Sequence, residues 1–274
     1  MIIHEVAPAK INLALHVTGL RADGLHVLDS VVAFAELGDL VSVEPERELS
    51  LAIKGPFADG LAMENNLVLD AALCFDRPAG KIELTKNLPV ASGIGGGSAD
   101  AAATIRVFSK MLGNKLEPAK ILSLGADVPV CLEAKPMQMS GVGERLTSIT
   151  NLPDLPAVLV NPNQPLSTSG VFSELGKKEN AALEPLPQSS STEDWIAYLR
   201  SCRNDLQSAA INILPEISTV LDALEDAALA RMSGSGATCF GIYETREEAQ
   251  SACQRIQKNH PNWWVQVTTI KGSR

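Results

Sequence analysis

The sequence predicts an α+β fold divided into two domains. Residues 9–17, 30–34 and 40–43 form apolar or alternating runs, which is the pattern of an N-terminal sheet. From Ala101, apolar side chains recur every three or four residues until Gly113, which predicts a helix with one apolar face. Strands and helices of this kind, not strictly alternating, are typical of α+β proteins.

Two stretches interrupt these patterns and suggest where the domains divide. Residues 152–165 are rich in proline, and residues 176–194 are polar and contain three consecutive serines. Because such segments do not continue a helix or a strand, we place a domain change near residue 150.

The last eighty or so residues repeat the mixture of helix and strand. We expect a helix over 217–229, a strand over 237–243 and a final strand over 263–270. Thr245 and Glu248 have the spacing of a capping box, which predicts the start of another helix between these strands.

Composition excludes several classes of protein. The chain has 274 residues and a net charge of −9, which argues against a partner as acidic as nucleic acid. It has no secretory signal pattern and no apolar run of about 20 residues, so we expect no membrane association. The five cysteines are widely spaced and read as reduced core thiols. Together these features predict a cytoplasmic protein.

The most informative segment is residues 88–100, where four glycines and two serines come directly before the predicted helix. Glycine is favoured where a ligand must approach the backbone closely, and a helix N-terminus attracts phosphate. The alternative is a flexible connection with an ordinary helix cap. The spacing matches neither the P-loop nor the Rossmann fingerprint. The residues predicted to bind ATP here are Pro89, Val90, Ala91, Ser92, Gly93, Ile94, Gly95, Gly96, Gly97, Ser98 and Ala99.

At these residues the sequence resembles the GHMP kinase superfamily. Three other segments match the same superfamily in the same order: Pro-Ala-Lys-Ile-Asn-Leu at 8–13, Gly-Ala-Asp-Val-Pro at 125–129 and Met-Ser-Gly-Ser-Gly-Ala at 232–237. The resemblance implies the two-domain GHMP kinase fold with its active site in the inter-domain cleft. It assigns ATP binding and catalysis to residues 1–150 and substrate binding to residues 151–274.

The resemblance also implies a catalytic pair. Asp127 matches the aspartate that accepts the hydroxyl proton, and Lys10 matches the lysine beside it, whose charge favours the ionised carboxylate. Taken alone, Asp127 would be a turn or cap residue and Lys10 a solvent-facing lysine on an edge strand.

Within the superfamily, the motifs resemble those of kinases that act on a cytidine-diphosphate-linked alcohol in isoprenoid precursor synthesis. The predicted substrate-binding residues are Asn12, Leu25, His26, Thr168 and Phe172. Asn12 lies two residues beyond Lys10 and so emerges on the same face of a strand. Leu25 stands where the family usually has tyrosine. Without the resemblance, His26 would be an incidental surface histidine and Phe172 a core residue.

Asn66 and Lys86 match positions near the family's adenine pocket, and the implied cofactor is ATP with Mg²⁺, for which Ser98 is the expected direct ligand. The segments 73–81 and 113–125 are shorter than usual for the family. Two alternatives stay open: another GHMP kinase acting on homoserine, mevalonate or a sugar, and a nucleotide-binding module without catalytic activity. The first is disfavoured by His26 and the 125–129 motif, and the second by the presence of Lys10 and Asp127.

Overall fold

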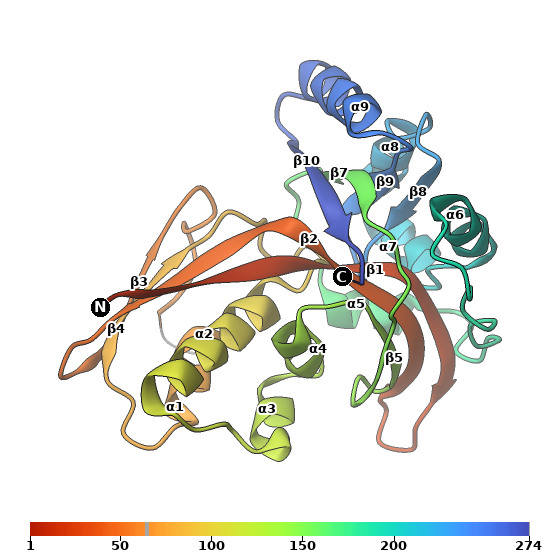
Figure 1. The fold of residues 1–274 in the computed structure, drawn as a ribbon. Helices are drawn as coiled ribbons and strands as arrows, with labels where there is room; N and C mark the ends of the chain where they lie inside the picture. The colour runs from red at the N-terminus through yellow and green to blue at the C-terminus, as the bar shows by residue number, and fades with distance from the viewer. Residues whose placement is uncertain (64–65, 274) are drawn as a thin grey trace. The chain divides into compact units, whose positions relative to one another are not determined.

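The computed structural model describes residues 1–63 and 66–273. The chain forms two compact units, each assembled from several segments (Figure 1). The first unit contains residues 1–10, 37–90 and 95–134, and the second contains the rest of the chain. The sequence analysis placed one boundary near residue 150, whereas these units interleave. The reason is that two long strands, β1 (Ile3–Leu20) and β2 (His26–Glu44), contribute residues to both units.

The sheet of the first unit is formed around the second half of β2. Strand β4 (Gly80–Thr85) pairs with it in antiparallel register, so that Leu40 lies opposite Thr85, and β3 (Leu49–Lys54) pairs with β4 in parallel. The predicted runs 30–34 and 40–43 therefore belong to one continuous strand, and only the apolar pattern of the sequence is interrupted between them. Gly38 lies between them, and a Cβ there would meet the carbonyl oxygen of Ala7 at 2.3 Å, so glycine permits the close approach of β1.

Among the described residues, the first unit contains the helices α1 (Leu67–Leu73), α2 (Gly96–Leu112), α3 (Pro118–Leu124) and α4 (Val128–Glu133). Helix α2 packs against α1 and α4, and α3 contacts α1 and α4 (Figure 1). The rings of Phe75 and Phe108 lie 5.8 Å apart between centroids in this layer. Helix α2 begins five residues earlier than Ala101, where the apolar pattern starts, because two glycines of the loop adopt helical conformation.

The second unit has a mainly antiparallel sheet. Strand β7 (Leu155–Asn161) lies between β10 (Trp264–Lys271) and β9 (Cys239–Ile242), and β8 (Leu229–Met232) pairs with β9. The first half of β2 pairs with β5 (Met137–Gly141), which forms a hairpin with β6 (Arg145–Ser148). The proline-rich stretch thus contains a strand that the sequence analysis did not expect.

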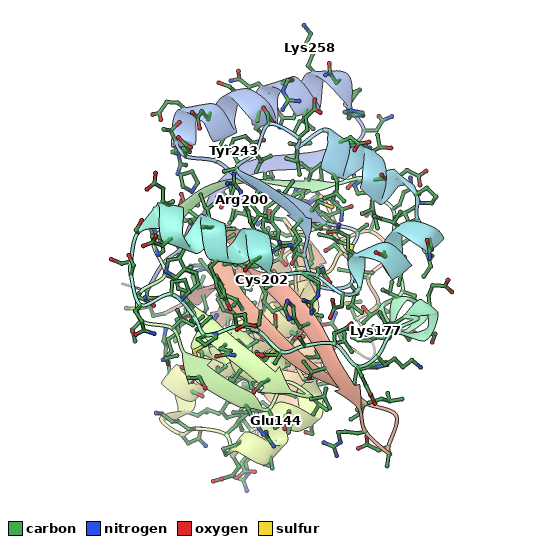
Figure 2. All side chains as sticks on the ribbon, turned by 90° about the vertical axis from the view of Figure 1, so that its right-hand side faces the viewer. Glu144, Lys177, Arg200, Cys202, Tyr243 and Lys258 are labelled. Atoms are coloured by element: carbon green, nitrogen blue, oxygen red, sulfur yellow. The ribbon has the colours of Figure 1, made fainter. Side chains whose placement is uncertain are left out.

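In the part of the chain that the structure describes, the helices of the second unit are α5 (Thr168–Glu174), α6 (Thr192–Ser201), α7 (Gln207–Ile213), α8 (Glu216–Asp222) and α9 (Arg246–Asn259). Helix α9 packs on β7 and β10, and its capping box forms as predicted. It buries Ala249, Cys253 and Ile256, while Lys258 extends away from the helix into solvent (Figure 2).

The predicted helix over 217–229 is wrong in its second half. Helix α8 ends at Asp222, and Leu229 begins β8. Between them, the N–H groups of Leu224 and Ala227 donate to the carbonyls three residues earlier, which is the pattern of successive turns. The buried Leu224 continues the apolar spacing through these turns, so periodicity alone could not detect the end of the helix.

The structure also shows the state of the cysteines and the character of the helices. In the described part of the chain all five cysteines are free; four of them are buried, and Cys74 is partly exposed, so the expected core position does not hold for Cys74. Across residues 1–63 and 66–273, no helix has both the length and the apolar character needed to span a bilayer.

Candidate functional site

Lys10 and Asp127 form an ion pair in the first unit. The Lys10 Nζ atom lies 2.6 Å from an Asp127 carboxylate oxygen. Lys10 comes from β1 and is buried, while the Asp127 side chain is 35% exposed. Asp127 occupies the N-cap position of α4, yet its side chain makes no cap hydrogen bond. The carboxylate is therefore held by the ammonium rather than by the helix, and it remains accessible to a ligand.

The glycine loop leads into α2 through a residue in the left-handed conformation. Gly95, the N-cap, has φ +65°, and a Cβ there would lie 3.1 Å from the Cβ of Lys10. No side chain caps this helix at its N-terminus. Because the first N–H groups of a helix have no acceptor inside the helix, Gly96, Gly97 and Ser98 present donors and a partial positive charge. This end of α2 can hold an anion near the Lys10–Asp127 pair.

Lys86 lies in a buried charge cluster that the sequence analysis missed. Its ammonium lies 2.5 Å from Asp39 and 2.8 Å from Asp100, and all three side chains are almost fully buried. Burial acts to lower the pKa of Lys86, but the carboxylates of Asp100 and Asp39 outweigh it and raise that pKa. Burial raises the pKa of Asp100 to about 7, against the opposing charge of Lys86.

The cluster holds both ends of the glycine loop, residues 88–100, which is called the phosphate loop below after its predicted role. Asp39 accepts hydrogen bonds from the N–H groups of Asn87 and Leu88, where the loop begins, and Asp100 lies in the second turn of α2, where it ends. A Cβ on Gly96 would lie 3.3 Å from the Lys86 Nζ. The sequence signal for this role was a lysine at the end of an apolar strand, which is costly unless it is paired. Its expected place near adenine stays a prediction.

Asn66 is the N-cap of α1, where its side chain accepts a hydrogen bond from the N–H of Val68 at 3.0 Å and donates to the carbonyl of Ala62. These contacts give the residue a structural role in the first unit. Its predicted contact with adenine stays a prediction.

In the second unit, His26 and Phe172 face one another. Their ring centroids lie 4.8 Å apart, with His26 at the start of β2 and Phe172 on α5. The His26 Nε2 atom is buried and has no hydrogen-bond partner among the described residues. Burial lowers the pKa of His26, and the positive charge of Lys178 lowers it further. A neutral imidazole with an unused nitrogen beside an aromatic ring suits recognition of a polar, planar base.

Leu25 precedes this ring pair and is 51% exposed. Its N–H donates to Asp23, and its carbonyl accepts from the N–H of Arg21, so the turn that carries it is well defined. An aliphatic side chain therefore stands where the family resemblance led us to expect an aromatic one.

Asn12 has an unused acceptor inside the second unit. Its Nδ2 donates to Ser30 at 2.8 Å and its backbone N–H donates to Ser233 at 3.1 Å, while its buried Oδ1 has no partner among the described residues. Ser233 in turn donates to the carbonyl of Gly93. The 232–237 loop and residues 91–94 of the phosphate loop are thus joined by direct hydrogen bonds.

Further contacts fix the 232–237 loop. The Asn204 side chain donates to the carbonyls of Met232 and Gly234, and the hydroxyls of Thr168 and Ser235 are 2.8 Å apart. Thr168 therefore connects the first turn of α5 to the second glycine loop. The structure brings four predicted residues of this unit into two groups: Asn12 and Thr168 contact the 232–237 loop, and His26 faces Phe172.

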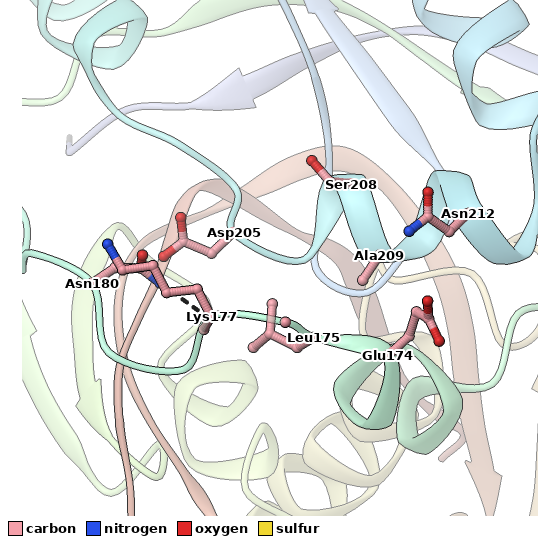
Figure 3. Close-up of a pocket in the computed structure, with 9 residues that line it drawn as sticks. Glu174, Leu175, Lys177, Asn180, Asp205, Ser208, Ala209 and Asn212 are labelled. Atoms are coloured by element: carbon pink, nitrogen blue, oxygen red, sulfur yellow. Dashed lines mark hydrogen bonds between the residues drawn. The ribbon is translucent and has the colours of Figure 1, made fainter.

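A separate pocket of about 450 Å³ lies beside the C-terminal end of α5 (Figure 3). Its walls include Glu174 and Lys177 on one side and Ser208 and Asn212 of α7 on the other. None of the residues predicted from the sequence lines it. No group of three or more histidine, cysteine, aspartate or glutamate side chains that could hold a metal occurs in the described part of the chain.

Comparison with protein families gives two matches. Residues 66–136 match the model described as GHMP kinases N terminal domain, and residues 186–262 match the model described as GHMP kinases C terminal.

Curated relatives match almost the whole chain. A protein of Paracoccus denitrificans is 52% identical over 97% of this chain and 96% of its own length, and one of Chelativorans sp. is 49% identical over 98% and 96%. Both are named 4-diphosphocytidyl-2-C-methyl-D-erythritol kinase.

Solved structures show the same fold. A crystal structure of 4-(cytidine 5'-diphospho)-2C-methyl-D-erythritol kinase matches with a TM-score of 0.79 and 29% identity, covering 98% of this chain and all of that one. A homoserine kinase from Cytophaga hutchinsonii, 18% identical over 99% of this chain and 95% of its own, has a TM-score of 0.68 and supports the fold alone.

Proposed function

The chain belongs to the GHMP kinases, a family of phosphotransferases that use ATP as phosphate donor, and we propose that it phosphorylates the 2-hydroxyl of 4-diphosphocytidyl-2-C-methyl-D-erythritol. This reaction would be a step in isoprenoid precursor biosynthesis. The observation that carries the proposal is the Lys10–Asp127 pair, because it joins a buried cation to an accessible carboxylate. The names of the relatives favour this acceptor among the alcohols used by the family.

Phosphoryl transfer requires positioning and charge stabilisation more than covalent chemistry. In the proposed reaction Asp127 accepts the proton of the attacking hydroxyl. Lys10 holds the carboxylate in place and offsets the negative charge that develops on the oxygen. The N-terminus of α2 binds the phosphates of ATP through its free N–H groups.

Mg²⁺ would accompany ATP, and the donor set at the start of α2 fits it. Mg²⁺ prefers oxygen ligands, retains several waters and is commonly bound through one or two protein groups together with phosphate oxygens. Ser98, in the first turn of α2, supplies a hydroxyl of this kind. When bound, the ion would neutralise charge on the phosphate chain.

For the nucleotide part of the acceptor, we propose that Phe172 stacks on cytosine and that His26 and Asn12 supply polar contacts. The buried His26 Nε2 and Asn12 Oδ1 atoms, both without partners among the described residues, support this assignment. A buried polar atom without a partner is costly, so a ligand that satisfies it gains specificity. Thr168 contributes by fixing the position of α5.

An assay of ADP release tests the proposal. The protein should turn over with the cytidine-linked methylerythritol and show at most slow release with homoserine, mevalonate or galactose. Comparable turnover with one of those alcohols would assign the chain to another branch of the family. ATP binding without product from any of the four would support a nucleotide-binding module without catalytic activity.

The phosphate loop gives the first mutational prediction. Replacing Gly97 with valine should weaken ATP binding about tenfold or more, because a side chain there would obstruct hydrogen bonds between phosphate and the start of α2. Among the described residues a Cβ on Gly97 meets only Leu67, at 3.7 Å, so the fold should persist. Gly96 is a poorer choice because its Cβ would contact Lys86. Calorimetric titration with a non-hydrolysable ATP analogue measures the effect.

Gly113 provides the control, since it ends the same helix with φ +70° and a Cβ there would have no atom of the described residues within 4 Å. Gly113→Ala should lower stability slightly through backbone strain and leave ATP affinity unchanged. Equal loss of affinity for ATP and for the cytidine substrate in Gly97→Val would mark the loop as structural.

The base pocket gives the second prediction. Leu25→Tyr should lower KM for the cytidine substrate by up to about tenfold with kcat nearly unchanged, because an aromatic contact is worth about 0.5–1.5 kcal/mol beyond burial. Phe172→Ala should raise KM strongly. Steady-state kinetics with the acceptor varied separates the two. An inactive Leu25→Tyr variant, or an unaltered KM in Phe172→Ala, would place the base elsewhere.

A further inference from the structure

Arg106 of α2 joins three elements of the first unit. Its Nε donates to Glu5 at 2.8 Å and its Nη2 donates to the carbonyl of Val6 at 2.8 Å, and both acceptors lie in β1. Its Nη1 donates to the carbonyls of Cys131 and Leu132 in α4, at 2.9 and 3.4 Å. The Arg106 side chain is 18% exposed. Each nitrogen of this largely buried guanidinium therefore has an acceptor in the protein.

Helix α4 depends on this arginine at its C-terminal end. The carbonyls of the last turn of a helix have no partners inside it, and α4 has only six residues. The N–H of its C-cap, Ala134, donates to the carbonyl of Val130. Arg106 supplies donors to the next two carbonyls, those of Cys131 and Leu132. Because α4 has no basic residue in its own last turn, Arg106 also provides the positive charge that is favourable at a helix C-terminus.

The contact with β1 is an ion pair shared by two cations. Glu5 accepts from Arg106 at one carboxylate oxygen and from Lys110 at the other, at 2.6 Å. Burial acts to raise the pKa of Glu5, but the hydrogen bonds from Lys110 and Arg106 outweigh it and lower that pKa. Lys110 is 59% exposed and, among the described residues, donates to no group of α4. It therefore shares the carboxylate with Arg106 without joining the two elements.

The two elements that Arg106 joins to α2 carry the two members of the Lys10–Asp127 pair. Lys10 lies in β1, four residues beyond Val6, and Asp127 is the N-cap of α4, four residues before Cys131. Since the Asp127 side chain makes no cap hydrogen bond, its place is set by Lys10 and by where α4 lies. A helix of six residues is only about 9 Å long, so a displacement of its C-terminal end also displaces its N-cap.

We propose that Arg106 is a positioning residue for phosphoryl transfer, which holds β1 and α4 so that Lys10 and Asp127 meet in the geometry that the transfer step requires. The proposal rests on the proposed function, because it takes this pair as the catalytic one. Arg106 acts through the two elements and not on the reacting atoms. A misplacement of about 1 Å can cost about 10²-fold in rate, so its loss should appear in kcat more than in binding.

Steady-state kinetics of three variants test this role. Arg106→Met removes every donor of the guanidinium and should lower kcat by about tenfold to 10²-fold, with KM for ATP and for the acceptor within about twofold. Arg106→Lys keeps a charge for Glu5 but lacks the planar fork that donates to β1 and α4 together, so its kcat should also fall. Lys110→Met is the control and should keep both kcat and KM, because it breaks only an exposed contact.

A double-mutant cycle distinguishes positioning from a general loss of structure. If Arg106 acts through Asp127, Arg106→Met should change kcat by less than about twofold when Asp127 is already asparagine. An equal factor in both backgrounds overturns the proposal, and so does a wild-type kcat in either Arg106 variant. Circular dichroism checks that each variant is folded at the assay temperature. If Arg106→Met does not fold, Arg106→Lys takes its place in the cycle under the same criteria.

These outcomes are separable from those for the proposed function. If the wild-type protein phosphorylates a different alcohol, the same cycle is measured with that alcohol, and a non-additive result there means that the acceptor is wrong and the role of Arg106 stands. If turnover with the cytidine-linked alcohol occurs and the cycle is additive, only the role of Arg106 fails.

The cycle can also be measured without any turnover, by urea unfolding. Asp127→Asn should cost less stability in Arg106→Met than in the wild type, because the contact between Lys10 and Asp127 has already been loosened. If no alcohol is phosphorylated and this coupling is found, the proposed function fails while Arg106 still positions the pair. Equal costs in the two backgrounds overturn the positioning by Arg106.

Discussion

Replacing Asp127 with asparagine should lower kcat by about 10²- to 10⁴-fold while ATP affinity remains, because an amide of the same shape cannot accept the hydroxyl proton. The structure indicates that this substitution should leave the fold intact. Asp127 stands at the N-cap of α4 but makes no cap hydrogen bond, so the helix does not depend on its carboxylate. Its ionic contact is to Lys10, at 2.6 Å. Single-turnover kinetics with ATP and the cytidine substrate measure the transfer step itself.

Glu83 offers a matched control in the same unit. It pairs with Lys54 at 2.6 Å and is 39% exposed, close to the values for Asp127. Glu83→Gln removes an exposed ion pair with a similar N···O distance from strand β4, and it should leave kcat unchanged, since exposed pairs contribute about 0–1 kcal/mol. Wild-type kcat in Asp127→Asn would assign the base to another residue.

The sequence carried enough information to predict that Lys10 and Asp127 lie together, because the pattern and the family motifs agree there. The run around Lys10 is a strand, and Asp127 lies three residues beyond the end of the short helix α3. Family resemblance then placed the two residues together, and they lie in contact. Their catalytic roles stay predictions.

Other features could not be predicted, for physical reasons. The partners of Lys86 come from residues 47 and 14 positions away, and no local pattern encodes such contacts. The connection after α5 has the composition of a linker, yet its backbone and short polar side chains bond to β1. Hydrogen bonds formed by polar residues over long sequence separations leave no periodic signal.

Replacing Lys86 with methionine should destabilise the protein by about 3–5 kcal/mol, because it leaves two buried carboxylates without their cation. The side-chain exposures of 4% for Lys86 and Asp100 and 0% for Asp39 leave little room for water to take the place of the ammonium. Since Asp39 and Asp100 lie at the two ends of the phosphate loop, ATP affinity should fall as well. Urea unfolding monitored by circular dichroism measures the loss of stability.

Lys54→Met is the control, because it breaks an exposed pair in which the lysine is 58% exposed, and it should cost about 0–1 kcal/mol.

The loss of unfolding free energy in Lys86→Met should also depend on pH. The folded-state pKa of Asp100, raised to about 7 from an ordinary value of 3.8, means that the folded protein takes up a proton there as pH falls through 7. Removing Lys86 raises that pKa further, so Asp100 becomes protonated at a higher pH in the variant than in the wild type. Protonation removes the buried negative charge and thereby reduces the loss of stability. The difference in unfolding free energy between the two should therefore shrink from pH 8 to pH 5. If Lys86→Met loses less than 1 kcal/mol of unfolding free energy at pH 8, or if the loss grows as the pH falls, the charge cluster does not stabilise the phosphate loop.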